Sequence, residues 1–279
     1  MHPLDNTVLQ ALIMGIVQGL TEFLPISSSG HLIIVPYLLG WDDEFITSLA
    51  FSVMLHIGTL AALLAYFRAD WVRIVPAGFA TIRDRSFAGD PDRRLAWLLV
   101  ATTIPAAVVG LVFSDVIETA IREPGLVALT LVVGGVIMWA ADRVGRMDRR
   151  VEDVTFPIAI AIGAAQALAL IPGISRSGIS ISAGRFAGLD RDAAARFSFL
   201  MATPITIGAI VFEIRRLVTG EAGVQVDLLP LVVGLASSFV AGVFAISVLL
   251  RYLRTHSLTV FVVYRFILAG LVLVYVATR

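Results

Sequence analysis

The stretch GIVQGLTEFLPISSSGHL (residues 15–32) decides the fold, because the chain contains it twice. The second copy, GAAQALALIPGISRSGIS (residues 163–180), lies 148 positions later and aligns without a gap. In each copy, an apolar segment with one glutamine breaks at a proline into a turn of serine and glycine. The recurring residues are Gly15 and Gly163, Gln18 and Gln166, Ile26 and Ile174, Ser27 and Ser175, Ser29 and Ser177, and Gly30 and Gly178.

The two copies differ in the reactive polar residues that they carry. The first copy adds Glu22, Ser28 and His31, whereas the second adds Arg176. Two similar segments with different polar groups predict one composite site that is assembled from two halves.

The composition indicates a membrane protein. Of 279 residues, 58% are hydrophobic and 15% are charged, with a mean hydropathy of +0.91; soluble domains have about 25% charged residues. Several apolar runs reach the roughly 20 residues that a helix needs to cross a bilayer. The net charge of zero gives no electrostatic basis for binding nucleic acid. The absence of cysteine excludes disulfides, thiolate nucleophiles and cysteine metal sites.

The hydropathy pattern predicts an all-α polytopic protein with six transmembrane helices and two re-entrant helix-loop-helix hairpins. In the first hairpin, the apolar segment 8–24 breaks at 25–30 and continues at 31–39; the second hairpin covers about 154–189. Irregular backbone at membrane depth is tolerated only where protein buries it or where it lines a cavity. The predicted spans are about 47–67, 95–113, 125–141, 195–214, 228–250 and 259–277.

Charged residues predict how the spans are oriented. The segments between the predicted spans and hairpins are expected to be loops. Arginines gather in 68–94, 142–153 and 251–256, whereas 42–46 and 114–124 are mainly acidic. The positive-inside rule places the arginine-rich segments in the cytoplasm and both termini outside. Three crossings per half then bring the hairpins in from opposite sides. We therefore expect one integral membrane domain, 1–279, made of two inverted repeats (about 1–141 and 154–279), as in transporters with broken helices at the midplane.

Two ionisable residues at membrane depth point to a site. An ionised group near the bilayer centre costs about 3 kcal/mol even on lenient insertion scales, so Glu22 and Arg176 need partners. The simplest arrangement lets the two hairpin tips supply each other. Gln18 precedes Glu22 by four residues and shares its helix face; for Gln18 and Gln166 the alternative role is hydrogen bonding between helices.

The two serine turns are candidate anion sites. Ser27-Ser28-Ser29-Gly30 and Ser175-Arg176-Ser177-Gly178 each precede a half-helix, whose free N–H groups and dipole favour phosphate. Arginine adds a bidentate fork for phosphate oxygens. The alternative is that the serines only cap helices.

Three further residues have roles that the sequence leaves open. His31 follows the first turn, where an imidazole could act as acid, base or nucleophile, or be structural. His56 lies in the middle of span 47–67, where packing or a hydrogen bond is expected. Arg265 lies about two turns into the last span and is expected to snorkel to the interface. These residues predict an intramembrane anion site but do not distinguish hydrolysis from transport.

Several motifs carry a family resemblance. QGLTEFLPISSSGH (18–31) and PGISRSG (172–178) resemble the two signatures of the bacterial undecaprenyl-pyrophosphate phosphatase family. The resemblance covers essentially the whole chain, including FSFLMATP (197–204) and the pair Tyr264-Arg265. Two residues depart from the family pattern: Gln18 takes the less acidic option of the first signature, and Ser180 stands where threonine is common.

The resemblance implies an activity and a location. Members of the family remove the terminal phosphate of C55 undecaprenyl pyrophosphate, which recycles the lipid carrier for cell-wall synthesis and confers bacitracin resistance on overproduction. The resemblance also implies a multi-pass protein of the bacterial plasma membrane, a site that opens outward, and a requirement for Mg²⁺ or Ca²⁺. The alternative function is a flippase or transporter of the lipid carrier or of another anion; a homo-oligomer is left open.

The resemblance also assigns roles to residues. Glu22 and Gln18 are expected to hold the metal or to position water. Arg176 is expected to clamp the pyrophosphate, and the attacking group is Ser28 or Ser27 with His31 as base, or His31 assists phosphoryl transfer in another way. The remaining pyrophosphate-binding residues are expected to be Ser27, Ser29, Gly30, Ser175, Ser177 and Gly178.

Overall fold

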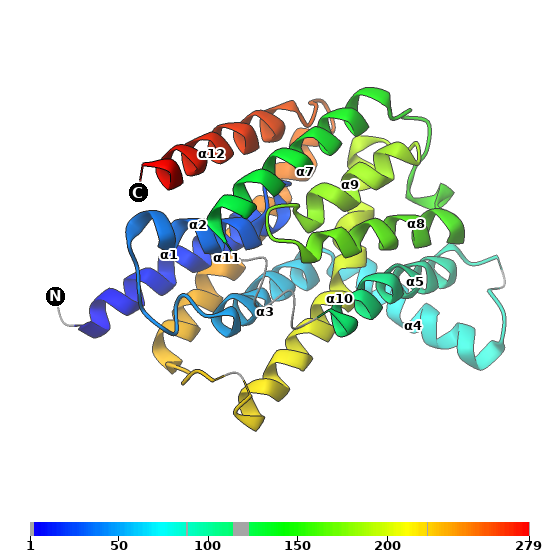
Figure 1. The fold of residues 1–279 in the computed structure, drawn as a ribbon. Helices are drawn as coiled ribbons and strands as arrows, with labels where there is room; N and C mark the ends of the chain where they lie inside the picture. The colour runs from blue at the N-terminus through cyan, green and yellow to red at the C-terminus, as the bar shows by residue number, and fades with distance from the viewer. Residues whose placement is uncertain (1–2, 88, 114–122, 222, 279) are drawn as a thin grey trace.

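The computed structural model describes residues 3–87, 89–113, 123–221 and 223–278. Within those ranges the chain forms eleven α-helices and two short 3-10 helices, and its only extended pairing is an isolated bridge between Arg149 and Leu189. The predicted all-α class is confirmed. Figure 1 shows the helices packed side by side, with α1 beginning and α12 ending on the left.

Six helices are long and apolar enough to cross a membrane, as predicted. Each predicted span overlaps one of them, with ends that differ by at most five residues. The six helices are α3 (Leu49–Tyr66), α5 (Pro91–Val112), α7 (Pro124–Val144), α10 (Arg191–Thr219), α11 (Leu228–Leu253) and α12 (Thr259–Ala277).

Both predicted hairpins consist of two helices with a break between them. The first comprises α1 (Pro3–Phe23) and α2 (Ser28–Leu39). The second comprises α8 (Phe156–Ala167), the 3-10 turn η2 (Leu168–Leu170) and α9 (Arg176–Phe186). At 1.5 Å per residue, α2 and α9 are too short to cross a hydrocarbon core of about 30 Å.

The two breaks have the same local geometry. Ser27 precedes α2 with φ 76°, and Ser175 precedes α9 with φ 76°. A non-glycine residue seldom adopts this left-handed backbone, which is typical of functional turns. Each serine Oγ accepts a hydrogen bond from the backbone N–H of the glycine three residues later, Gly30 or Gly178. The sequence repeat is therefore also a repeat of backbone conformation.

Each hairpin packs against a helix from the other part of the chain. Helix α1 lies so close to α11 that a Cβ on Gly15 would be 2.3 Å from the Gly234 carbonyl oxygen. Helix α8 lies equally close to α5, where a Cβ on Gly163 would be 2.4 Å from the Thr102 carbonyl oxygen. Small residues permit such approaches between membrane helices. The division of the chain into two repeats, 1–141 and 154–279, stays a prediction. Two such repeats would be expected to pack against each other in this reciprocal way.

The arginine-rich segment 68–94, which we expected to be a loop, contains a helix. Helix α4 (Arg68–Asp84) is amphipathic. Its apolar residues Val72, Val75, Phe79 and Ile82 are exposed and recur at a spacing that places them on one face of the helix. The prediction was wrong because the charge of the segment masked this helical spacing. Such a helix is suited to lie in a membrane interface.

The predicted cytoplasmic segments contact one another at one end of the molecule. Arg196 of α10 donates to Asp70 of α4, and Arg191 donates to Asp142 at the end of α7. Asp142 also accepts from the backbone N–H of Leu258, before α12. In Figure 1 this end lies opposite the start of α1 and the end of α12. Of the acidic segment 114–124, residues 114–122 lie outside the described residues.

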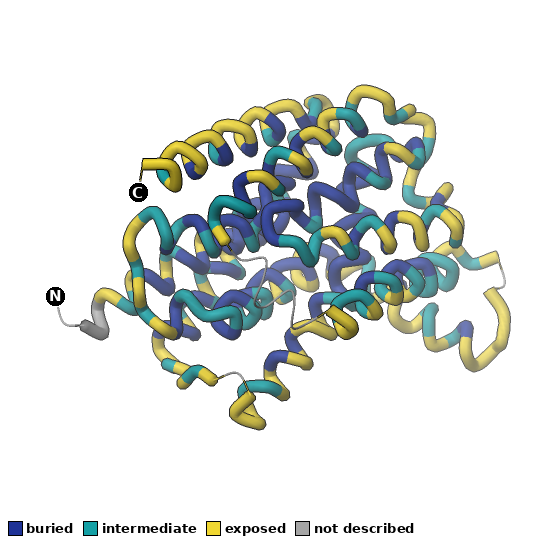
Figure 2. The backbone as a smooth tube through the Cα atoms, in the orientation of Figure 1, coloured by how far each residue is buried: buried dark blue, intermediate teal, exposed yellow. Residues whose placement is uncertain are grey.

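Burial is concentrated in α9 and the helices that pack against it. Figure 2 shows α9 mostly buried, whereas α12 is exposed along most of its length. The exposed side chains of α12 are largely apolar, as is expected where a helix faces lipid. The core of the fold therefore surrounds the two broken helices and fixes the place where they meet.

Candidate active site

The hairpin tips meet at a cavity of about 230 Å³. Its polar lining comes from α1, the start of α2, α3, α8, the start of α9, and α10. The polar lining residues are Glu22, Ser28, Ser29, His56, Gln166, Arg176 and Thr206. The predicted composite site is therefore present as one space that both repeats line.

The carboxylate of Glu22 is the centre of this cavity's hydrogen bonds. Glu22 is 5% exposed. Its Oε1 accepts from the Arg176 guanidinium, and its Oε2 accepts from Ser28 Oγ and, at 3.0 Å, from Gln18 Nε2. A buried carboxylate needs this compensation because losing hydration is costly. The prediction that the two tips supply each other's ionic partner is confirmed.

Arg176 is the more exposed partner of the ion pair with Glu22. It is the first residue of α9, one position after the left-handed Ser175. Its Nη1 donates to Thr206 Oγ1 at 3.3 Å, and its side chain remains 19% exposed, against 3% for that of Glu22. Of the two charges, the guanidinium is therefore the more accessible to an incoming anion.

His56 belongs to the site, although the sequence suggested only packing or a hydrogen bond. Its Nε2 lies 3.4 Å from Glu22 Oε2, and its Nδ1 lies 2.9 Å from the Ser52 carbonyl oxygen. The carbonyl can only accept, so Nδ1 carries a proton and Nε2 faces the carboxylate. The sequence did hold one signal for a functional role, because His56 is an ionisable side chain inside an apolar span. That its partner is Glu22 could be known only from the tertiary packing.

The serines divide into two groups. Ser28 and Ser29 line the cavity. Ser27 is fully buried, and its Oγ accepts from the backbone N–H of Gly173 in the other tip at 3.1 Å. In the other direction, Ser177 Oγ of the second tip donates to the Leu24 carbonyl of the first tip. The residues that join or cap the tips without lining the cavity are Ser27, Gly30, Ser175, Ser177 and Gly178.

His31 is adjacent to the first turn but does not line the cavity. Its Nδ1 lies 2.7 Å from the Ser27 carbonyl oxygen, and its Nε2 lies 2.7 Å from Tyr264 Oη. Both ring nitrogens are thus engaged with the backbone of the turn and with α12. In this arrangement His31 supports the turn that presents Ser28; its part in catalysis stays a prediction.

Arg265 does not snorkel, contrary to expectation. It is fully buried and donates to the carbonyls of Pro25 in the first tip and of Gly173 and Ile174 in the second, at 3.3, 2.7 and 3.1 Å. It also donates to the Leu131 carbonyl. Position along the helix suggested the interface, but carbonyls left free by the two breaks attract the guanidinium inward. Arg265 therefore joins both tips.

The donors for the metal that the resemblance implies are few. Among the described residues no group of three or more His, Asp or Glu side chains could hold a metal ion. Mg²⁺ is commonly held by one or two carboxylates together with substrate phosphates and water. Glu22 and the buried Gln18 Oε1, which has no hydrogen-bond partner among the described residues, fit that kind of site. They do not fit a cage made of protein ligands alone.

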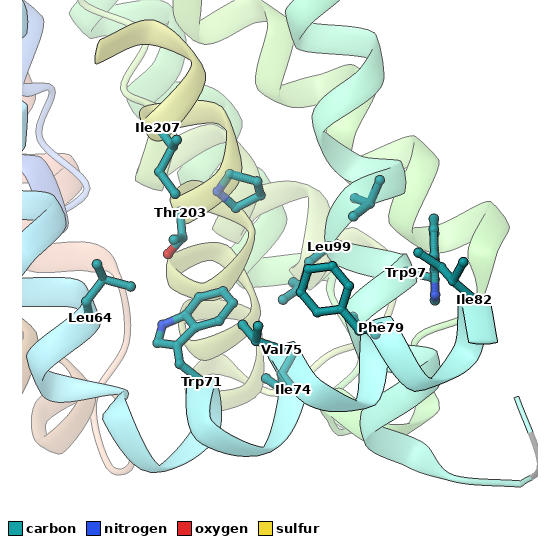
Figure 3. Close-up of a pocket in the computed structure, with 14 residues that line it drawn as sticks. Leu64, Trp71, Ile74, Val75, Phe79, Ile82, Trp97, Leu99, Thr203 and Ile207 are labelled. Carbon is teal, nitrogen blue, oxygen red and sulfur yellow. The ribbon is translucent and has the colours of Figure 1, made fainter. Parts of the chain in front are cut away.

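A second cavity, of about 370 Å³, lies between α4, α5 and α10. Figure 3 shows its lining, which includes Trp71 and Phe79 of α4, Trp97 of α5, and Thr203 of α10. No titratable side chain lies among the described residues that line it. It therefore lacks the means for acid–base or anion chemistry, and the cavity at the hairpin tips is the candidate active site.

The fold and the site together define a class: a polytopic helical membrane protein in which two broken helices enclose a carboxylate, an arginine and a serine. The chain belongs to the bacitracin resistance protein BacA family, whose model matches residues 11–271. The chain is 47% identical over 273 residues to a protein of Gemmatimonas aurantiaca named undecaprenyl-diphosphatase, covering 98% of this chain and 99% of that one.

Two further relatives carry the same name, undecaprenyl-diphosphatase. The one from Desulforudis audaxviator is 44% identical over 268 residues, covering 96% of this chain and 97% of its own. The one from Moorella thermoacetica is 45% identical over 266 residues, covering 95% and 97%. The family predicted from the two signatures is confirmed.

Proposed function

We propose that this chain is an undecaprenyl-diphosphatase, which hydrolyses undecaprenyl diphosphate to undecaprenyl phosphate and inorganic phosphate. The observation that carries the proposal is the contact of Glu22 with both Ser28 and Arg176 in one cavity. A nucleophile, a base and a phosphate-binding cation are the parts that this reaction needs. The names of three full-length relatives support the same substrate.

Ser28 is the attacking group in this proposal. Its hydroxyl lines the cavity and already donates to Glu22 Oε2, whereas Ser27 is buried and occupied with the second tip. Ser28 Oγ bonds to the terminal phosphorus as its proton passes to Glu22. The bond from that phosphorus to the bridging oxygen breaks, and the lipid monophosphate leaves with the bonding electrons. Glu22 passes this proton to the departing lipid phosphate. Water then attacks the phosphorus of the phosphoserine and gives one proton to the serine oxygen as the bond from Oγ to phosphorus breaks, which releases inorganic phosphate and restores the serine.

Arg176 changes partner during this reaction. In the structure its charge compensates Glu22. A diphosphate carries more negative charge than one carboxylate and offers oxygens suited to the guanidinium fork. Arg176 therefore binds the phosphate, and His56 remains beside Glu22 to stabilise the carboxylate. Charge stabilisation of this kind supplies much of the catalysis in phosphoryl transfer.

A divalent cation, Mg²⁺ or Ca²⁺, is the expected cofactor. Glu22 and Gln18 would hold it together with substrate oxygens, and it would supply charge neutralisation at the diphosphate. Removal of the cation by a chelator is expected to stop phosphate release, and its return is expected to restore it.

The orientation in the membrane is part of the proposal. The arginine-rich segments contact one another at one end of the helices, which supports a cytoplasmic location for that end. The active site then opens to the outer face of the bacterial plasma membrane, and both termini lie outside. The alternative function, a flippase or transporter, is not favoured, because the full-length relatives are named as diphosphatases.

Phosphate release by the purified chain tests the proposal. We expect release from prenyl diphosphates with Mg²⁺ and loss of at least about 100-fold in Ser28→Ala, within the range for removing a catalytic group. Ser247→Ala is the control, because Ser247 bonds only within α11. Substrate labelled in the terminal phosphate should transfer label to the wild type and not to Ser28→Ala. No release by the wild type would refute the function; label on another residue would refute Ser28 alone.

A further inference from the structure

One polar residue of the cavity has no hydrogen-bond partner in the described part of the chain. Gln166 is 3% exposed, and neither its amide nitrogen nor its amide oxygen has a hydrogen-bond partner among the described residues. The interhelical hydrogen bond that the sequence allowed for is therefore not present. Burying an amide without partners costs folding free energy. The cost falls on a residue that lines the reaction cavity.

The repeat indicates what the amide lacks. Gln166 occupies the position in the second copy that Gln18 occupies in the first. Gln18 Nε2 donates to a carboxylate oxygen of Glu22, four residues later on the same helix. The residue four positions after Gln166 is Leu170, which carries no oxyanion and also lines the cavity. Gln166 thus retains the donor of this pair, and the residues that the structure describes supply no acceptor for it.

The surroundings select the class of acceptor. Arg176 and Glu22 both line this cavity, and the guanidinium is the more exposed of the two charges, so the space beside Gln166 favours an anion. An amide N–H donates well to a phosphoryl oxygen and adds no net charge of its own. The amide oxygen remains available to a water molecule.

We infer that Gln166 is a substrate-binding residue whose Nε2–H donates to a non-bridging oxygen of the diphosphate. This oxygen corresponds to the Glu22 carboxylate oxygen that accepts from Gln18 in the first copy. This inference rests on the proposed function, because it assigns a contact to the same substrate. Gln166 takes no proton and forms no covalent bond; it holds the diphosphate against Arg176 while Ser28 attacks.

Two substitutions test this contact. Gln166→Leu removes the donor, and Gln166→Glu keeps the shape but places a negative charge next to the phosphate. With a short prenyl diphosphate and Mg²⁺, we expect KM to rise about tenfold in Gln166→Leu, the value of a hydrogen bond to a charged group. We expect a larger rise in Gln166→Glu, because like charges repel.

Thermal unfolding separates binding from a structural role. Because Gln166 has no partner among the residues that the structure describes, Gln166→Leu should keep or raise the Tm of the purified protein. Loss of a structural hydrogen bond would instead lower the Tm. Thr203→Val is the matched control, because Thr203 is equally buried and its hydroxyl also lacks a partner, but it lines the apolar cavity. We expect its KM to equal that of the wild type.

The outcomes distinguish the two proposals. Unchanged KM in Gln166→Leu, or a KM in Gln166→Glu equal to or below that of Gln166→Leu, would overturn the role of Gln166 while the phosphatase stands. A lowered Tm with unchanged KM would make Gln166 structural. A wild type that releases no phosphate would refute the proposed function itself. Binding of methylenediphosphonate, weaker in Gln166→Leu than in Thr203→Val, would support the contact without turnover.

Discussion

Arg176 and Glu22 lie 154 residues apart in the chain, and their side chains form an ion pair where the two hairpin tips meet. The carboxylate is buried, and the guanidinium reaches the cavity. Neither hairpin alone supplies both charges. The pair therefore couples the stability of the fold to the integrity of the site.

A double-mutant cycle on this pair should show strong coupling. Removing one partner of a buried ion pair costs about 3–5 kcal/mol, because the other charge is left uncompensated. We expect Glu22→Gln and Arg176→Met each to lower stability by roughly that amount, and the double variant to lose clearly less than the sum. Denaturant or thermal unfolding in detergent measures this. All three variants should lose phosphate release; additive losses of stability would contradict the pairing.

Substitution of His56 should impair catalysis while the ion pair between Glu22 and Arg176 stays intact. Its Nε2 faces the carboxylate oxygen that also accepts from Ser28. We expect His56→Ala to lower kcat about tenfold or more, because the base loses a neighbour that orients and stabilises it. His256→Ala serves as the control, since His256 is exposed next to Thr255. Equal kcat values for the two variants would remove His56 from the site.

Arg265 should matter for both stability and activity. It donates to carbonyls of both tips, so Arg265→Met leaves several buried acceptors without a partner, each worth about 1–3 kcal/mol. We expect a loss of at least about 3 kcal/mol in unfolding free energy together with reduced phosphate release. The exposed Arg251 provides the comparison, and Arg251→Met should unfold as the wild type does. A wild-type Tm for Arg265→Met would contradict this role.

The close packing of the second hairpin gives a steric prediction. A Cβ at Gly163 would lie 2.4 Å from the backbone of Thr102, whereas a Cβ at Gly208 meets nothing within 4 Å. Gly163→Ala should therefore lower the free energy of unfolding by about 1–3 kcal/mol, the usual cost of overpacking. Gly208→Ala should leave it nearly unchanged. If the two variants unfold alike, α5 and α8 do not approach as closely as described.

Cysteine labelling tests the orientation, and the absence of native cysteine leaves no background. Glu44 and Arg150 are exposed and lie in segments that we place on opposite sides of the membrane. An impermeant thiol reagent applied to intact cells should label Glu44→Cys and spare Arg150→Cys. Disruption of the cells should expose both. The reverse pattern in intact cells would invert the proposed topology.

The sequence predicted the helices because their signals are local. Length and hydropathy determine a span, and the six predicted spans match six helices. The two breaks were predictable from Pro25 and Pro172, which precede the serine turns. The error at α4 has a local cause as well: six arginines in segment 68–94 obscured an apolar face at helical spacing.

Pairing between distant residues was predictable only where the cost of burying a charge in the membrane left one possible partner. Glu22 and Arg176 were expected to meet because each is a charge at membrane depth. His56 and Arg265 have the same property, yet several partners were open to each of them. Packing of α3 and α12 selected Glu22 for the first and the tip carbonyls for the second.

The sequence by itself determined the fold class, the repeated broken hairpin and the ionic residues of the site, because hydropathy and charge act on each segment independently of its neighbours. Only the tertiary structure decided which serines face the cavity, which histidine meets the carboxylate, and that Gln166 has no partner among the described residues. Those choices depend on distances between helices far apart in the chain. Such distances are set by how glycines, carbonyls and apolar faces pack together.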